Sequence, residues 1–265
     1  KQQTQSKFVV LLWGPALSGK TVLASQFPKP YFIDLDGQMG SVLSLAKKSG
    51  ADVDFPVIQI DESPTEDPDF LNLCGKNFAK MTAWTKLKKL VEVLSQKLGD
   101  DETLVLDNLS RAGEFLTADI KRRGGRQQMQ IQDWGTFYDE MATIVDYLHT
   151  PYGKSNTILI GHEGSKKDEL SGELFKTLLM PGSFKERIPS KVSDFLYLNV
   201  SVTGPKNKRE IKRLLQSIPD PKNPVGSRSM IPDMPDPTYQ KMRPYIEDYL
   251  GRKLGDPTWI PKENL

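Results

Sequence analysis

Apolar residues gather in short uninterrupted runs along the chain, and turn-forming residues bound each run. Such runs have the length and the edges of buried β-strands. They cover residues 8–13, 31–35, 56–60, 103–106, 157–160 and 195–202. Between them, apolar residues at helical spacing predict amphipathic helices, clearest in residues 84–94 and 136–148. Strands that alternate with helices indicate βαβ units, so we predict an α/β fold, a mostly parallel twisted sheet with helices on both faces.

Three segments depart from this alternation. Residues 121–133 are rich in Arg and Gln, and residues 163–182 are polar with three glycines. Segments of this kind inside a compact domain are usually functional loops or disordered, so both are predicted to be long loops. Residues 210–217 suit either a helix or the second strand of a hairpin, and the pattern leaves both open.

The end of the chain has a different composition. Its last 48 residues contain nine prolines, which argues against long helices. One apolar stripe, at residues 238–250, predicts a helix that Pro244 kinks or delays. We therefore expect a core of residues 1–217 and a proline-rich extension, residues 218–265, packed on that core.

Composition narrows the classes of protein. With 265 residues, of which 37% are hydrophobic, the chain buries a sizeable core, and its single cysteine, Cys74, cannot close an internal disulfide. Two histidines and one cysteine are too few for a zinc site of His and Cys ligands. The net charge of +2 limits nucleic-acid binding to local basic patches. The longest apolar run is too short for a membrane span and no secretion signal opens the sequence, so a cytoplasmic location is expected.

A phosphate-binding motif follows the first predicted strand. It matches G-x-x-x-x-G-K-[ST] and consists of Gly14, Pro15, Ala16, Leu17, Ser18, Gly19, Lys20 and Thr21. The glycines let the loop fold tightly, so that backbone N–H groups face the phosphates at the start of the next helix. Lys20 is expected to reach the β- and γ-phosphates, and the Thr21 hydroxyl to ligate Mg²⁺. The pattern predicts ATP and Mg²⁺ as cofactors, and an ordinary glycine turn is the alternative.

Two predicted strands end in carboxylates. Residues 103–106 lead into Asp107, the arrangement in which a strand-end aspartate supports the Mg²⁺ that bridges the phosphates. Asp36 follows the second strand and is expected to polarise the attacking water, with Asp34 supporting it. The alternatives are a solvated strand-end side chain for Asp107 and a turn-initiating one for Asp36.

The order of these motifs resembles the RecA-type ATPase core. Residues 32–36 look like the second strand of that family, where an acidic residue at the position of Asp36 activates water. Residues 157–163 resemble its later strand, which ends in a γ-phosphate sensor, here His162 in place of the glutamine of the bacterial recombinase. A strand-end histidine bonded to the backbone is the alternative for His162. A more particular resemblance is to phage-encoded RecA-core ATPases of single-strand annealing and recombination. It is carried by the phosphate loop and by residues 34–37, 132–135, 161–163 and 215–237.

This resemblance implies an ATPase that assembles side by side, as a ring or a filament, with each site completed by a basic residue of a neighbouring copy. Arg228 falls where the family places that cation, and Lys222 is the second choice. A solvated loop arginine is the alternative. The host would be a bacterium if the chain is phage-encoded.

Basic clusters raise the question of single-stranded DNA. The segment expected to carry the first DNA loop contains Lys121, Arg122, Arg123 and Arg126. Lys166 and Lys167 fall in the expected second loop, and flexible cationic loops suit a backbone that is tracked without reading its sequence. The alternative is a solvated run of charge. A further basic patch is left unassigned: Lys206, Lys208, Arg209, Lys212 and Arg213.

Together these features predict an ATP-dependent, single-stranded DNA-binding ATPase of recombination or annealing that acts as a homo-oligomer. A single-strand DNA-binding protein is a candidate partner. Lys20, Asp36, Asp107, His162 and Arg228 are the expected catalytic residues. A helicase or packaging-type motor of the same fold is one alternative. A nucleotide-gated protein-interaction module is the other.

Overall fold

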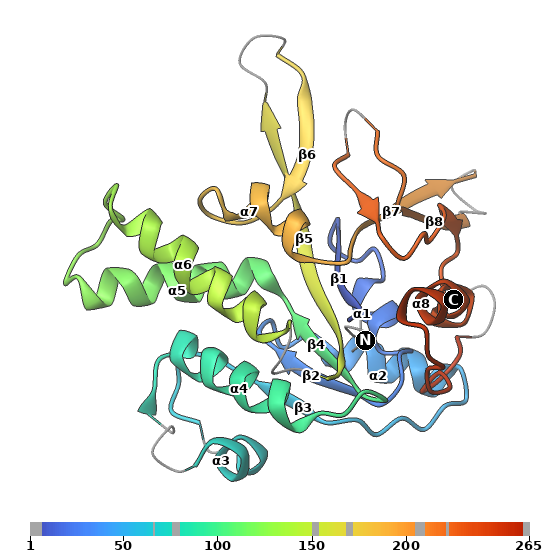
Figure 1. Ribbon diagram of the computed structural model, residues 1–265, viewed down its shortest axis with the longest axis horizontal. Helices are drawn as coiled ribbons and strands as arrows, with labels where there is room; N and C mark the ends of the chain where they lie inside the picture. Colours follow the sequence, from blue (N-terminus) through green and yellow to red (C-terminus); the bar gives the residue numbers. More distant parts are fainter. Residues whose placement is uncertain are drawn as a thin grey trace, which may run out of the picture.

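The computed structural model describes residues 7–65, 67–75, 80–149, 154–167, 172–204, 210–220 and 223–261 (Figure 1). Its strands are β1 (Val9–Gly14), β2 (Pro30–Asp34), β3 (Val57–Gln59), β4 (Thr103–Asp107), β5 (Asn156–Lys167), β6 (Leu174–Leu178), β7 (Asp194–Thr203), β8 (Glu210–Gln216), β9 (Gly226–Ser227) and β10 (Met234–Pro235). Its helices are α1 (Lys20–Ala24), α2 (Met39–Lys48), α3 (Pro68–Cys74), α4 (Ala83–Lys97), α5 (Leu109–Arg123), α6 (Asp133–Tyr147), α7 (Phe184–Arg187) and α8 (Tyr239–Leu250).

The strands form one mixed sheet in the order β10-β8-β7-β1-β5-β4-β2-β3. The run from β7 to β3 is parallel, whereas β6, β8, β9 and β10 join antiparallel. β5 lies between β1, which leads into the phosphate loop, and β4, which ends in Asp107. The predicted α/β fold with a mostly parallel sheet is therefore confirmed.

Each face of the sheet carries its own hydrophobic cluster. Successive side chains of a strand point to opposite faces, so Val9, Leu11 and Trp13 of β1 enter one cluster and Val10 and Leu12 enter the other. Helices α4, α5 and α6 cover the first face, and α1, α2 and α8 cover the second. Helices on both faces explain why the central strands are apolar without alternation.

The segment predicted as a long loop at residues 163–182 is instead a hairpin, which is a correction. β5 continues past the sheet to Lys167, and β6 pairs with it antiparallel (Figure 1). The side chains described between Glu163 and Leu178, in residues 164–167 and 172–177, are half-buried or exposed, so they lack the apolar signal of a core strand. Residues 210–217, left open between helix and strand, form β8 in a hairpin with β7.

The segment predicted as a loop at residues 121–133 is corrected at its ends only, because residues 124–132 do form a loop. α5 continues to Arg123, and α6 begins at Asp133, so residues 124–132 connect the two helices. α5 buries Leu116, Asp119 and Ile120 on one face, but its last turn is basic. Because this last turn lacks apolar residues, the hydrophobic pattern does not predict that the helix extends so far.

The helix predicted at residues 238–250 is confirmed as α8, with Pro244 inside it and the Thr238 side chain accepting the Lys241 N–H at its start. Its buried residues, among them Tyr239 and Ile246, join the second cluster. Across the described ranges, no helix is both long and apolar enough to cross a bilayer.

Candidate functional site

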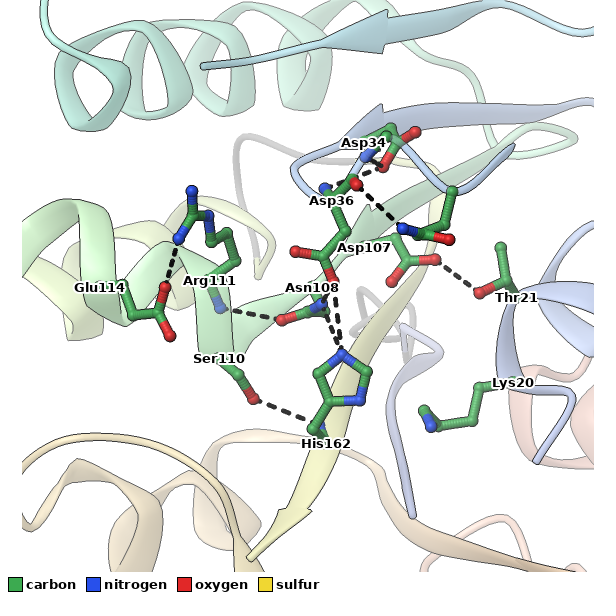
Figure 2. Close-up of polar contacts among 12 residues, drawn as sticks. Lys20, Thr21, Asp34, Asp36, Asp107, Asn108, Ser110, Arg111, Glu114 and His162 are labelled. Atoms are coloured by element: carbon green, nitrogen blue, oxygen red, sulfur yellow. Dashed lines mark hydrogen bonds and ion pairs between the residues drawn. The ribbon is translucent and has the colours of Figure 1, made fainter. Parts of the chain in front are cut away.

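The carboxyl ends of the parallel strands place the predicted site residues along one edge of the sheet. Gly14 of β1 is in register with His162 of β5, and Asp34 of β2 is in register with Asp107 of β4. Residues far apart in the sequence therefore meet in one place, because parallel strands end at the same edge (Figure 2).

The predicted phosphate loop connects β1 to α1. Lys20 is 4% exposed, and its Nζ donates to the carbonyl oxygens of Gly14 at 3.1 Å and Pro15 at 2.6 Å. Burial lowers the pKa of Lys20 to about 8, although Asp107 and Glu163 act in the opposite direction. A buried ammonium group bonded only to uncharged groups favours the approach of an anion, as a phosphate-binding lysine should.

Glycine is required at the start of the loop by close packing. A Cβ at Gly14 would lie 2.4 Å from the carbonyl oxygen of Leu198 on β7, which is closer than any real contact. The loop backbone is therefore pressed against the neighbouring strand, and substitution there would displace one or the other.

Thr21 and Asp107 meet beside Lys20. The Thr21 hydroxyl donates to Asp107 Oδ2 at 2.6 Å (Figure 2). Burial raises the pKa of Asp107 to about 6, and the Thr21 hydrogen bond opposes that shift only in part. A hydroxyl and a carboxylate are the hard oxygen donors that Mg²⁺ prefers when phosphate oxygens complete its shell, so these residues fit Mg²⁺ with a nucleotide.

Asp36 belongs to a polar cluster across from Lys20. It lies two residues beyond β2, where the Asp34 carboxylate accepts the N–H of Asp36 at 3.0 Å and of Gly37 at 2.9 Å. Its own carboxylate is 3.4 Å from His162 Nε2. The hydrogen bond with His162 holds the pKa of Asp36 below its usual range, against the effect of burial. Asp36 is therefore ionised at neutral pH and can accept a hydrogen bond from water.

Asn108 connects Asp36 and His162 within this cluster, and the sequence analysis missed it. Its Nδ2 donates to Asp36 Oδ2 and lies 3.0 Å from His162 Nε2, while its Oδ1 accepts the Arg111 N–H at 2.8 Å (Figure 2). Asn108 is the N-cap of α5. An asparagine directly after a strand-end aspartate and before an amphipathic helix is an N-cap signal, and this signal could have found it.

A pocket of about 310 Å³ opens beside this cluster. The pocket is lined by Leu35, Asp36, Asn108, Ser110, Arg111, Glu114, His162 and Leu179. Asp36, Asn108 and His162 therefore face space in which a reacting group and water can lie. Arg111 and Glu114 form an ion pair at its rim, at 2.5 Å.

Arg228 is not brought to the site of its own chain. Its N–H donates to the Ser193 carbonyl at 3.1 Å, and the Ser193 N–H donates to the Val9 carbonyl at 2.7 Å. Arg228 therefore lies beside the start of β1, about 17 Å along that strand from Gly14 at the usual rise per residue. It is exposed. Lys222 lies outside the described residues.

The predicted first DNA loop is corrected. Lys121, Arg122 and Arg123 form the last turn of α5. Arg122 pairs with Glu62, Arg123 with Asp119 and Glu140, and Arg126 with Asp133. These arginines therefore pair with carboxylates of their own chain, and only Arg126 lies in the connection between α5 and α6.

Lys166 and Lys167 do lie beyond the site, on the β5–β6 hairpin. Both are exposed, and Lys166 forms an exposed ion pair with Glu186 at 3.2 Å. β5 carries His162 at the site and these lysines further along the same strand, so one element links the two places.

A scan against protein families gives one match that spans most of the chain. Residues 6–229 match the family model described as an AAA domain, a family of P-loop ATPases. No curated protein matches the chain. The matched range includes the phosphate loop, Asp107 and His162, the residues that meet at the sheet edge. The chain belongs to the AAA domain family.

Proposed function

We propose that this chain hydrolyses ATP with Mg²⁺, that it does so as a homo-oligomer, and that it uses the cycle to handle single-stranded DNA in recombination or annealing. The carrying observation is the cluster of Asp36, Asn108 and His162, which faces a pocket at the same sheet edge as Lys20 and the Thr21–Asp107 pair. A phosphate loop alone binds nucleotide. The cluster adds polar groups that can hold the attacking water, which hydrolysis requires.

Each residue has a role in this proposal. Lys20 binds the β- and γ-phosphates, and the loop amides orient them. Asp36 is ionised and fixed by Asn108, so it holds water in line with the γ-phosphate and accepts its proton. Thr21 and Asp107 would hold Mg²⁺, which when bound neutralises charge on the phosphate oxygens. His162 shares Asn108 with Asp36 and senses whether the γ-phosphate is present.

The DNA-handling part is supported by the hairpin that continues from His162. The root of the hairpin is tied to the sheet: Tyr197 of β7 donates to Glu163, and Lys176 of β6 donates to the Tyr197 hydroxyl at 2.7 Å. Lys166 and Lys167 lie four and five residues past His162, about 13–17 Å away along an extended strand. A contact of His162 with the γ-phosphate can therefore move the projecting, cationic hairpin through strand β5. We propose that this hairpin binds the DNA backbone.

Assembly is supported by the position of Arg228. This cation is exposed and lies at the amino end of the strands, opposite the phosphate loop of its own chain. A head-to-tail arrangement of copies would bring Arg228 of one copy to the site of the next, where a guanidinium stabilises the transferring phosphoryl group.

The test is ATP turnover with and without single-stranded DNA across a salt series. We expect DNA to stimulate turnover, and the stimulation to fall steeply with salt because phosphate contacts release counterions. Replacing both hairpin lysines, K166Q with K167Q, should remove the stimulation and leave basal turnover, whereas the matched R122Q/R123Q variant should keep it. Turnover that ignores DNA at every salt concentration would contradict the DNA-handling part, and it would favour the protein-interaction alternative.

A further inference from the structure

Arg213, from the basic patch that the sequence analysis left unassigned, contacts the phosphate loop. It lies on β8 opposite Val200 of β7, and β7 is the neighbour of β1 (Figure 1). Its Nε donates to the carbonyl oxygen of Ser18 at 3.2 Å, a contact between residues 195 positions apart. A Cβ at Gly19 would lie 3.1 Å from the same nitrogen. The guanidinium group therefore packs directly on the Ser18–Gly19 peptide.

The contact with the Ser18 carbonyl also affects the N–H of the same peptide. The Ser18–Gly19 peptide is trans, so its N–H points away from its C=O. A hydrogen bond from Arg213 that fixes the Ser18 carbonyl therefore also fixes the direction of the Gly19 N–H, and loops of this type use such amides to bind the β-phosphate. A hydrogen bond from a cation also polarises the peptide and strengthens that N–H as a donor.

Asp236 holds the Arg213 backbone through two hydrogen bonds. The Arg213 C=O accepts the Asp236 N–H at 2.9 Å, its N–H donates to Asp236 Oδ1 at 3.4 Å, and its side chain is half-buried. Gly19 has a φ of +99°, a region that favours glycine, so the peptide would otherwise turn more freely than most. Arg213 thus connects the well-held strand β8 to the Ser18–Gly19 peptide, whose conformation is otherwise less restricted.

We propose that Arg213 is a positioning residue of the nucleotide site: it orients the Gly19 amide toward the β-phosphate and connects the β7–β8 hairpin to the phosphate loop. The inference rests on the proposed nucleotide binding. It requires that diphosphate and triphosphate be affected alike, because both carry a β-phosphate. It adds a residue that neither the motif nor the family match assigns.

The experiment compares R213Q, R213K and the neighbouring K212Q by equilibrium titration with fluorescent ADP and ATP analogues. Lys212 is exposed on the other face of β8 and pairs with Glu210 at 3.9 Å, so K212Q is a matched loss of charge. We expect R213Q to raise the Kd of both nucleotides about tenfold, as for the loss of one charge-assisted hydrogen bond. R213K should recover part of the affinity, and K212Q should bind as the wild type does. The melting temperature without ligand should stay close to that of the wild type in all three.

Two outcomes with folded R213Q overturn the inference. If R213Q binds nucleotide with unchanged affinity, the contact does not position the loop. If R213Q and K212Q lose the same affinity, the effect comes from the loss of positive charge in general. If R213Q fails to fold, R213K decides: a native melting temperature with raised Kd for both nucleotides supports the inference, and wild-type affinity overturns it. Failure of the wild type to bind nucleotide would instead sink the proposed function, and is seen in the same titration.

Discussion

The sharpest consequence of the site is that replacing Asp107 with asparagine should stabilise the protein when no ligand is bound. Asp107 is 6% exposed, and burial raises its pKa from the usual 3.8 to about 6. The unfolded chain releases this proton near the usual pKa and the folded chain near 6, so between the two the folded state binds more protons. Its stability therefore falls as the pH rises through that window.

The size of the effect follows from the shift. A little over two pKa units at about 1.4 kcal/mol per unit corresponds to about 3 kcal/mol at pH 7.5. At pH 5, between the two pKa values, roughly half of that penalty applies. D107N removes the charge and keeps an oxygen that can accept from Thr21, so it should recover up to these amounts.

The assay is urea unfolding of ligand-free wild type and D107N at pH 7.5 and at pH 5. We expect the free energy of unfolding of the variant to be higher, with a larger gain at pH 7.5. D101N is the matched control, because Lys29 lowers the pKa of the exposed Asp101, and it should give no gain. With Mg²⁺ and ATP the order should reverse, because only the wild type keeps its carboxylate for Mg²⁺. No gain in D107N, or an equal gain at both pH values, would refute the reasoning.

The remaining predictions concern binding, turnover and assembly. K20A should abolish nucleotide binding, whereas nucleotide near 100 times Kd should raise the free energy of unfolding of the wild type by about 2.7 kcal/mol. Thermal melts with and without nucleotide compare the two proteins. An equal rise in melting temperature in both would contradict phosphate binding by the loop. N108A should keep binding but lose at least about tenfold in turnover, since Asp36 and His162 lose the amide that joins them; steady-state kinetics would show a change in kcat with little in KM. R228A protein mixed with wild type should lower turnover out of proportion to its share, and a strictly proportional response would argue against a shared site.

The sequence predicts best those parts whose signals are local. The strand, the glycines and Lys20 of the phosphate loop stand together within residues 9–21, and Asp107 directly follows an apolar strand. Parallel strands then bring Asp36, Asp107 and His162 to one edge, as the motif order implied. The fold class follows from the same alternation of strands and helices.

The parts that were missed depend on contacts between distant residues or lie outside the core. The β5–β6 hairpin leaves the sheet, so its exposed residues carry no burial pattern. The basic end of α5 has the composition of a loop, yet Arg122 and Arg123 find carboxylates on other elements. Arg213 lies 195 residues from the loop that it contacts, and only the pairing of β7 with β8 brings them together.

The central claim is that the turn between β1 and α1 receives a nucleoside triphosphate. A crystal structure with Mg²⁺ and a non-hydrolysable ATP analogue tests it most directly. The account predicts the phosphate chain inside residues 14–21, with Lys20 on the β- and γ-phosphates and Thr21 on the metal. An analogue bound elsewhere on the molecule, with this turn empty, would contradict it.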